Sequence, residues 1–363
     1  DGEYTTLRPV EWCWIRNMAG VKGITAVVTG GSGFVGQRLV EMLVERGAKR
    51  VVSFDIAPKP LDALDHRAIE YVQGDLTNPD VVNKICKGAD CVWHIAALVG
   101  PFHKKEAYVK VNYDGTINII NACRAHGVKK LVYSSSPSTR FDGSDIDGLK
   151  ESQMSYPKKF LELYAETKAM GERAVFEACS PELRTVAIAP HQVYGPRDTL
   201  FLPNLLEAIG NGKLRVFGRG ENKVSFCHVD NYAHGLILGY DALYEHSPAL
   251  AKFYIVTDGP PQKFWRVLDA AGQAMGFTSL FRKFHLPVFL LMGVAYILEL
   301  LGWMLGRRFK VNPFTVKMLT IHRWFNIEAA RQDLGYEPIV TFENGWADTM
   351  HWFRENWLPK QSF

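Results

Sequence analysis

The 363-residue sequence predicts an α/β protein, with a doubly wound parallel sheet and a smaller C-terminal lobe. Short β-branched runs alternate with amphipathic helical stretches through about the first half of the chain. Several of these runs end in glycines, acids or serines, and the hydrophobic content of 47% suits a globular protein. Such alternation is typical of parallel sheets, which bind ligands at the carboxyl ends of their strands.

The first strand and helix enclose a glycine-rich loop. A β-branched run over 25–29 predicts the strand, and 34–46 predicts the helix. Gly31, Gly33 and Gly36 have the spacing G-x-G-x-x-G, which lets the backbone approach a pyrophosphate beside the N–H groups of the helix. The sequence therefore predicts a Rossmann-type dinucleotide site at Gly30, Gly31, Ser32, Gly33, Phe34, Val35 and Gly36.

Acidic residues end the next two predicted strands. The run 50–54 closes on Asp55, 19 residues beyond the last glycine of the loop, where a carboxylate can accept ribose hydroxyls. Asp55 would repel a 2′-phosphate, which favours NAD over NADP. The run 69–75 places Asp75 and Leu76 where an adenine edge could be held.

Further elements continue the alternation. The predicted helices cover 79–85 (started by Asn78 or Pro79), 108–125, 160–179, 202–210 and a stretch from an N-cap at Asp230 to near Tyr244. The predicted strands cover 91–97, 131–136, 184–188 and 253–257. Ala96 and Ala97 end one strand with small side chains, which allow a ligand to approach the backbone.

Residues 286–306 form an apolar stretch with one charge, Glu299, and basic residues on both sides. As a helix it would span about 30 Å, the thickness of a hydrocarbon core. We expect it to lie in one membrane leaflet rather than to cross the bilayer. The alternative is a buried or lid helix.

Composition excludes several classes of function. A net charge of +4 without a basic tract does not indicate a nucleic-acid partner, and no metal site is recognisable. Six cysteines without a C-x-x-C pair indicate free thiols in a reducing compartment. Residues 1–17 lack the apolar core of a secretory signal, and Met18 is a candidate natural start.

The expected domain organisation has three parts. Residues 1–23 are an N-terminal extension, and 24–193 form the nucleotide-binding domain, rejoined by 224–257. The substrate lobe comprises 194–223 and 258–363, and includes the apolar segment 286–306.

Five motifs resemble the extended short-chain dehydrogenase/reductase family, and within it the 3β-hydroxysteroid dehydrogenase branch, closest to its decarboxylating sterol dehydrogenases. They are Thr29–Gly36, His94–Ala97, Asn112–Thr116, Tyr133–Ser136 and Tyr164–Lys168. The branch is indicated by Pro190-His191 with Tyr194–Asp198, by 226–231 and by the apolar segment after Pro287. The resemblance runs from about Ile24 to Trp352 and implies that NAD is bound also by Ala96, Ala97, Asn112, Tyr164, Lys168 and Pro190.

The resemblance implies alcohol oxidation, which needs a base for the hydroxyl proton and an acceptor for hydride. Tyr164 and Lys168 lie one helical turn apart, and the lysine ammonium would lower the pKa of the tyrosine that acts as base. Ser136, or Ser135 if the strand ends one residue earlier, would orient the substrate oxygen.

Other polar residues near the expected site have less defined roles. Asn112 would fix backbone or water near the lysine, and Arg140 or Arg197 could pair with a substrate carboxylate. We expect His94 to pack inside the sheet, and His191 is a candidate for the pocket wall.

The leading interpretation is oxidation of the 3β-hydroxyl of a sterol, with decarboxylation of a 4α-carboxysterol, on a membrane such as the endoplasmic reticulum or a lipid droplet. Three alternatives remain open: a dehydrogenase/isomerase, a nucleotide-sugar epimerase or dehydratase, and a non-catalytic nucleotide-binding subunit. The apolar stretch 286–306 is not explained by the sugar alternative, and the pairing of Tyr164 with Lys168 argues against the non-catalytic one. A homodimer is left open.

Overall fold

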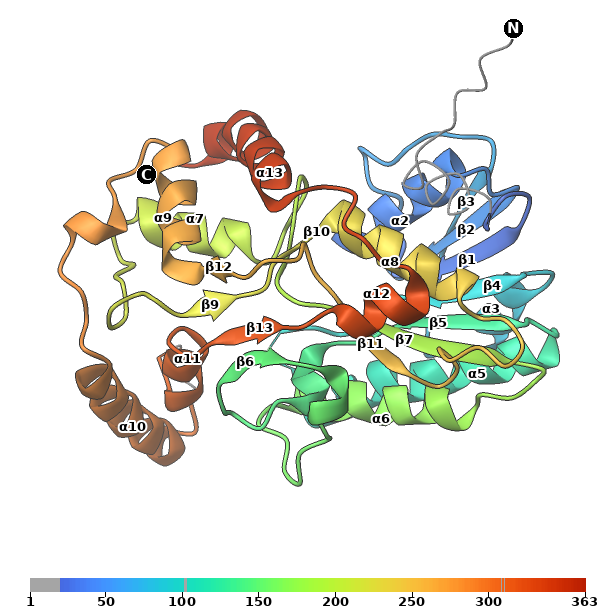
Figure 1. The fold of residues 1–363 in the computed structure, drawn as a ribbon, viewed down its shortest axis with the longest axis horizontal. Helices are drawn as coiled ribbons and strands as arrows, with labels where there is room; N and C mark the ends of the chain where they lie inside the picture. The colour runs from blue at the N-terminus through green and yellow to red at the C-terminus, as the bar shows by residue number, and fades with distance from the viewer. Residues whose placement is uncertain (1–19, 101–102, 308, 310) are drawn as a thin grey trace, which may run out of the picture.

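The computed structural model describes residues 20–100, 103–307, 309 and 311–363, so the predictions for 1–19 lie outside it (Figure 1). Within these residues a seven-stranded parallel sheet has the order β11-β7-β5-β4-β1-β2-β3, which confirms the doubly wound prediction. Its strands are β1 (Thr25–Thr29), β2 (Arg50–Asp55), β3 (Ile69–Gln73), β4 (Cys91–His94), β5 (Lys130–Ser134), β7 (Arg184–Pro190) and β11 (Phe253–Val256).

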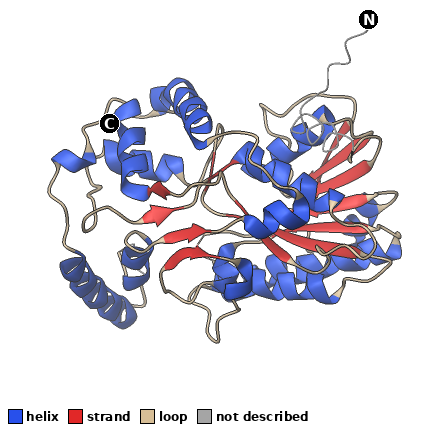
Figure 2. Ribbon diagram, viewed as in Figure 1, coloured by secondary structure: helices blue, strands red, loops and turns tan. Residues whose placement is uncertain are grey.

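Helices cover both faces of the sheet (Figure 2). One face carries α2 (Phe34–Glu45), α8 (Val229–Asp241) and α12 (Glu328–Leu334), and the other carries α3 (Pro79–Cys86), α5 (Gly115–Ala125) and α6 (Leu163–Glu177). Strand β1 shows why: Ala26 and Val28 pack in the first layer and Val27 in the second, because successive side chains alternate across a strand.

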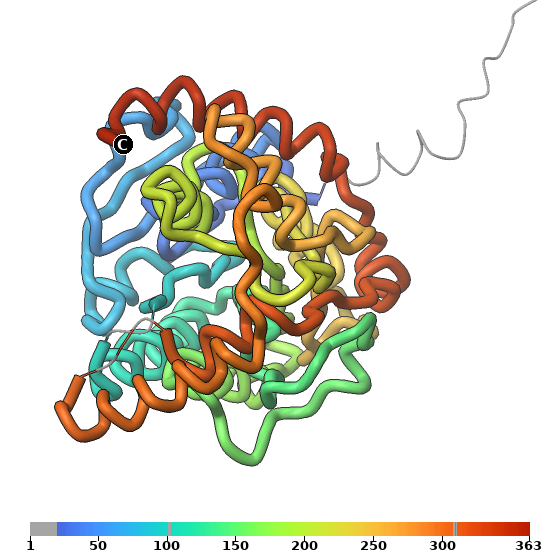
Figure 3. The backbone as a smooth tube through the Cα atoms, turned by 90° about the vertical axis from the view of Figure 1, so that its left-hand side faces the viewer, coloured from blue at the N-terminus to red at the C-terminus, as the bar shows by residue number. Residues whose placement is uncertain are grey.

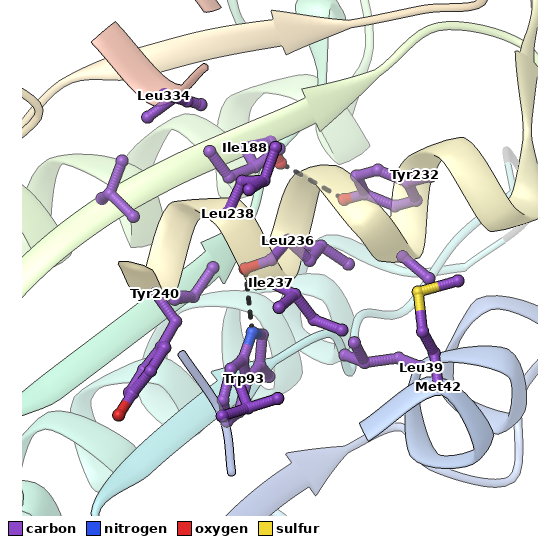
Figure 4. Close-up of a cluster of buried hydrophobic side chains, with 14 of the residues drawn as sticks. Leu39, Met42, Trp93, Ile188, Tyr232, Leu236, Ile237, Leu238, Tyr240 and Leu334 are labelled. Carbon is purple, nitrogen blue, oxygen red and sulfur yellow. Dashed lines mark hydrogen bonds between the residues drawn. The ribbon is translucent and has the colours of Figure 1, made fainter. Parts of the chain in front are cut away.

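The layer between α2, α8 and the sheet is closed by buried aromatic residues whose polar tips are satisfied (Figure 4). Trp93 Nε1 donates to the Leu236 carbonyl at 3.0 Å, and Tyr232 Oη donates to the Ile188 carbonyl at 3.2 Å. Buried Trp and Tyr need such partners, so these bonds fix α8 against β4 and β7.

A second lobe surrounds another apolar cluster that contains Phe226, Trp265 and Phe353. Its helices are α7 (Leu202–Gly210), α9 (Phe264–Ala274) and α13 (Phe342–Asn356). Two small sheets link this lobe to the first: β12-β9-β13-β6 and β10-β8. Their strands are β6 (Ile146–Leu149), β8 (Val193–Tyr194), β9 (Lys223–Val224), β10 (Cys227–His228), β12 (Gln262–Lys263) and β13 (Arg323–Phe325).

Several element boundaries differ from the predictions, and the starts of three helices are among them. The helix expected over 108–125 is α4 (Lys105–Tyr108), a π-helical turn (Val109–Asp114) and α5. Helix α6 begins at Leu163, three residues after the expected start. The N-cap of α8 is His228 rather than Asp230, because the His228 ring accepts a hydrogen bond from the Asp230 N–H at 3.3 Å.

The apolar stretch forms helix α10 (Val288–Leu305), followed by α11 (Pro313–Met318). Among the described residues it is the one helix long and apolar enough to cross a membrane, with a mean hydropathy of 2.1 and 11% of its residues buried. It lies at the rim of the molecule, away from the main sheet (Figures 1 and 3). A buried helix, one form of the alternative, is therefore wrong, since only Ala295 and Gly302 of α10 are buried, and a lid helix stays a prediction.

Candidate active site

The glycine loop packs so closely that side chains are excluded from it. Gly30 has φ of +73°, and a Cβ there would lie 2.8 Å from the Ala96 nitrogen. A Cβ on Gly36 would lie 1.9 Å from the Gly30 carbonyl oxygen. The loop therefore presents backbone to the cleft at the N-terminus of α2, a geometry that fits a pyrophosphate.

Asp55 ends β2 with its carboxylate held by backbone N–H groups. Ser32 N donates to Oδ2 and Ala57 N donates to Oδ1, each at 3.0 Å. The side chain lines the cleft, and the nearby Lys59 pairs with Asp65 at 3.4 Å instead. The Asp55 carboxylate thus has a fixed orientation at the cleft, and its contact with a ribose stays a prediction.

A cleft of about 600 Å³ runs along the carboxyl ends of the strands. The predicted site residues that line it are Gly30, Gly33, Phe34, Val35, Gly36, Asp55, Asp75, Leu76, Ala96, Ala97, Ser136, Tyr164, Lys168 and Pro190. Gly31, Ser32 and Asn112 do not line the cleft. Each of them forms a hydrogen bond with a residue that does, namely Phe54, Asp55 and Leu98 respectively. The loop, the two acids and the Tyr164 region, predicted separately, thus share one cavity.

Sequence reasoning missed several lining residues, among them Ile56, Leu98, Gln192, Phe201 and Tyr232. Ile56 could have been found, since it directly follows Asp55 at the strand end. Phe201 and Tyr232 belong to the second lobe and to α8, and they reach the cleft only through the tertiary fold.

Asn112 fastens the loop after β4 to α6. Its Oδ1 accepts from Leu98 N at 2.7 Å, and its Nδ2 donates to Leu98 O at 3.2 Å and to Thr167 Oγ1 at 3.1 Å. Thr167 is next to Lys168, so Asn112 holds backbone near the lysine. It sits in the π-helical turn, a distortion that is frequent at functional sites.

Tyr164, Ser136 and Lys168 meet at the end of the cleft. Tyr164 is hydrogen-bonded to the Ser136 side chain. Lys168 Nζ donates to the Ser134 carbonyl at 2.6 Å and lies 4.1 Å from the centre of the Tyr133 ring. Because β5 ends at Ser134, Ser136 is the serine beside the tyrosine, while Ser135 donates to Glu172.

Burial controls the pKa of both α6 residues. It raises the pKa of Tyr164 to about 12, against the lowering effect of the Ser136 hydrogen bond. It lowers the pKa of Lys168 to about 7, against the opposing charge of Glu172. The expected lowering of the tyrosine pKa by Lys168 is not found: desolvation of the phenolate is the largest effect, and the hydrogen bond from Ser136 is the one that opposes it.

The two arginines considered for a substrate carboxylate are occupied by glutamates. Arg140 pairs with the fully buried Glu172 at 2.7 Å, and Arg197 contacts both oxygens of Glu41 at 2.7 and 2.8 Å. Using either for a ligand would weaken an ion pair that is already formed. Both arginines are therefore engaged within the protein, and the two suggestions stay predictions.

The two histidines near the cleft are neutral. His94 is buried between Thr29 and Thr116 at 2.7 and 3.0 Å, and burial lowers its pKa to about 3, which agrees with a packing role. His191 Nδ1 lies 2.8 Å from the Ser225 carbonyl, so it donates there. His191 is absent from the cleft lining, although Pro190 and Gln192 on either side belong to it.

An apolar pocket of about 280 Å³ lies on the other side of Tyr164, with Phe141, Leu161 and Phe314 in its walls. A larger hollow of about 750 Å³ shares Leu161 and Phe314 and extends to Trp303 on α10. Tyr164 therefore stands between a cleft shaped for a dinucleotide and an apolar space that adjoins the exposed helix.

Residues 27–285 match the 3-beta hydroxysteroid dehydrogenase/isomerase family. The chain is 34% identical over 339 residues to the sterol-4-alpha-carboxylate 3-dehydrogenase, decarboxylating, of Mus musculus, covering 92% of this chain and 91% of the relative. It is also 34% identical over 322 residues to the 2-alkyl-3-oxoalkanoate reductase of Stenotrophomonas maltophilia, covering 88% of this chain and 96% of that one.

The fold is similar to that of the epimerase Mth375 from Methanothermobacter thermautotrophicus, with a TM-score of 0.76 and 22% identity over 98% of this chain and 99% of that one. At this identity the likeness concerns the fold alone.

Proposed function

The chain belongs to the 3-beta hydroxysteroid dehydrogenase/isomerase family, and we propose that it oxidises the 3β-hydroxyl of a 4α-carboxysterol with NAD, releasing carbon dioxide. The observation that carries this proposal is the position of Tyr164, hydrogen-bonded to Ser136 between the dinucleotide cleft and the apolar pocket. A water-insoluble ring system in that pocket would present its hydroxyl to the tyrosine.

The residues of the cleft fit NAD. The glycine loop would hold the pyrophosphate, Asp55 the adenosine ribose, and Lys168 the nicotinamide ribose. When bound, NAD accepts the hydride from the carbinol carbon.

Tyr164 would remove the hydroxyl proton, and Ser136 would orient the substrate oxygen by a hydrogen bond. A phenol with a pKa of about 12 is almost entirely protonated at neutral pH, so little of the basic phenolate is present. The positive charge of the oxidised nicotinamide, together with that of Lys168 in its protonated form, would favour the phenolate. Asn112 would keep this arrangement rigid through Leu98 and Thr167.

Oxidation makes decarboxylation chemically easy. Once C3 is a ketone, the carboxylate on C4 is β to it. The bond from C4 to the carboxylate breaks, carbon dioxide leaves, and the electron pair forms an enolate that is then protonated at C4. Hydrogen bonds from Tyr164 and Ser136 would stabilise the charge on the enolate oxygen.

Two similar relatives carry names that describe the same functional group. A sterol-4-alpha-carboxylate 3-dehydrogenase acts on a carboxylate with an oxygen function on the β carbon, and so does a 2-alkyl-3-oxoalkanoate reductase. We therefore propose that the site recognises a β-hydroxy or β-oxo carboxylate, with the apolar pocket selecting the sterol.

Helix α10 would place the enzyme on a membrane in a monotopic arrangement. The chain returns after α10 to α11 and β13, which pairs with β6 and β9 of the same body. A single crossing of the bilayer would place those partners on opposite sides. The hollow between α10 and Leu161 would then open beside the lipid. The enzyme itself would lie in a reducing compartment, at the surface of the endoplasmic reticulum or of a lipid droplet.

The substrate assignment is tested with NAD and two sterols, one 3β-hydroxylated and 4α-carboxylated, the other 3β-hydroxylated and unsubstituted at C4. We expect NADH formation and release of labelled carbon dioxide from the first. If the unsubstituted sterol turns over well and carbon dioxide is never released, the decarboxylating function is wrong and only the dehydrogenase remains.

A further inference from the structure

Arg323 is the first residue of β13, the strand that lies between the two lobes (Figure 1). It pairs with Ile146 of β6 on one side and Val224 of β9 on the other. The residue as a whole is half-buried, and its Nε atom is covered by the protein.

The guanidinium of Arg323 has only neutral acceptors. Nη2 donates to the Met318 carbonyl at 3.0 Å, and Nη1 lies 3.5 Å from His191 Nε2, which is free to accept because Nδ1 donates to Ser225. The Nε atom is buried without a hydrogen-bond partner. Throughout the described part of the chain no carboxylate pairs with Arg323, and burial alone lowers its pKa to about 10, so it remains a cation at neutral pH.

Three other partly buried arginines have acidic neighbours. Arg140 and Arg197 each pair with a glutamate. Burial also lowers the pKa of Arg46, but the charges of Asp241 and Glu45 oppose the effect. An uncompensated buried charge destabilises a fold, so a cation kept without a counter-charge points to an anion supplied by a ligand.

The two residues that hold Arg323 belong to segments that border Tyr164 from different sides. His191 lies between Pro190 and Gln192, which line the dinucleotide cleft together with Tyr164. Met318 ends α11, whose Phe314 lines the apolar pocket together with Tyr164. Arg323 itself lines neither cavity, and its two contacts join it to the segments that carry the lining residues of both.

We propose that Arg323 binds the carboxylate of the substrate while Tyr164 and Ser136 hold the oxygen on the β carbon. This inference rests on the proposed function and identifies the residue that makes it selective for carboxylates. A guanidinium with unused donors can accept a carboxylate through two parallel N–H···O bonds, which fix direction as well as charge. The substrate would then be held at two points around the carbon that loses hydride.

The test compares Arg323→Met and Arg323→Lys with Lys223→Met, which removes an exposed cation from the neighbouring strand β9. We expect Arg323→Met to raise KM for the 4α-carboxysterol about 100-fold, with a smaller change in kcat, since losing one partner of a buried charge pair has an effect of this order. Activity on the unsubstituted sterol and the affinity for NAD should stay within about threefold. Arg323→Lys should recover part of the loss, and Lys223→Met should behave as wild type.

An unchanged KM for the carboxysterol in Arg323→Met would overturn this inference and leave the proposed function intact. If the wild type oxidises no sterol, the proposed function fails, and calorimetry with a 2-alkyl-3-hydroxyalkanoate in the presence of NAD decides the role of Arg323. Binding that the wild type shows and Arg323→Met loses supports the carboxylate site. Equal binding by both proteins, or none by either, rejects it.

Discussion

The site has a dinucleotide side, at the glycine loop and Asp55, and a substrate side, at the apolar pocket and α10. The two sides differ in how many of their polar groups have hydrogen-bond partners within the protein. On the dinucleotide side Asp55 is held by two N–H groups and Asn112 by three hydrogen bonds. On the substrate side Arg323 keeps a buried Nε without a partner, and Trp303 of α10 is 81% exposed. A rigid, satisfied half suits a cofactor with one shape, whereas the unsatisfied charge and the apolar surface of the other half would be available to the proposed substrate and membrane.

Tyr164 belongs to both regions, so its replacement should have the largest effect. We expect Tyr164→Phe to lower kcat by a factor of about 10³, within the range for losing a general base, with NAD affinity nearly unchanged. The phenyl ring fills the same space, and the residues proposed to hold the pyrophosphate lie elsewhere. Steady-state kinetics and NAD titration measure the two effects.

The matched control for this replacement is Tyr296→Phe, which removes the hydroxyl of an exposed tyrosine on α10 and should retain full activity. Appreciable dehydrogenase activity in a folded Tyr164→Phe protein would exclude the tyrosine as the base, and with it the link between the two regions.

The second prediction concerns the exposed face of α10. Replacing Phe289 and Trp303 by serine should weaken binding to phospholipid vesicles by at least about 100-fold, because burying each aromatic side chain contributes roughly 1.5–3 kcal/mol. These side chains are 75% and 81% exposed, so the melting temperature should change little. Vesicle flotation and thermal unfolding provide the two measurements.

The control is Leu61→Ser, which removes an equally exposed apolar side chain far along the chain from α10 and should not alter vesicle binding. Protease accessibility adds a topological test: Phe363 and the glycine loop should lie on the same side of the membrane. Their appearance on opposite sides would contradict the monotopic arrangement.

The same division explains what could be predicted from the sequence. The glycine loop, Asp55 and the pair Tyr164 and Lys168 depend on short spacings within one strand-to-helix turn or one helix, where local rules hold. The meeting of these groups at one edge of the sheet then follows from the alternation of strands and helices, which predicts parallel strands with their carboxyl ends on the same side.

The substrate side depends on contacts between distant segments, which no local pattern encodes. Arg140 and Arg323 look alike in the sequence, yet Glu172 on α6 pairs with the first and no described carboxylate pairs with the second. The predicted N-cap of α8 was wrong for a similar reason. His228 forms the cap, although aspartate has the higher intrinsic preference for N-cap positions. The apolar stretch 286–306 predicted a helix, and only packing showed it to be exposed.

The last and smallest effect concerns cofactor choice on the dinucleotide side. Asp55 is fixed by Ser32 N and Ala57 N, and the nearest candidate cation, Lys59, is paired with Asp65. The carboxylate should therefore repel a 2′-phosphate, and NAD should have the higher kcat/KM.

Asp55→Asn keeps the shape and removes the charge, so the ratio of kcat/KM for NADP to that for NAD should rise about tenfold, or roughly 1.4 kcal/mol. Asp75→Asn, which neutralises the other acid of the cleft near the adenine position, should leave that ratio unchanged. The replacement Asp55→Asn alters only the charge beside the ribose and leaves the other proposed cofactor contacts in place. The effect should therefore appear in KM for the cofactor rather than in kcat. Similar kcat/KM values for NAD and NADP in the wild type would mean that the acid ending β2 does not contact the ribose, and the satisfied geometry of this half would then need another explanation.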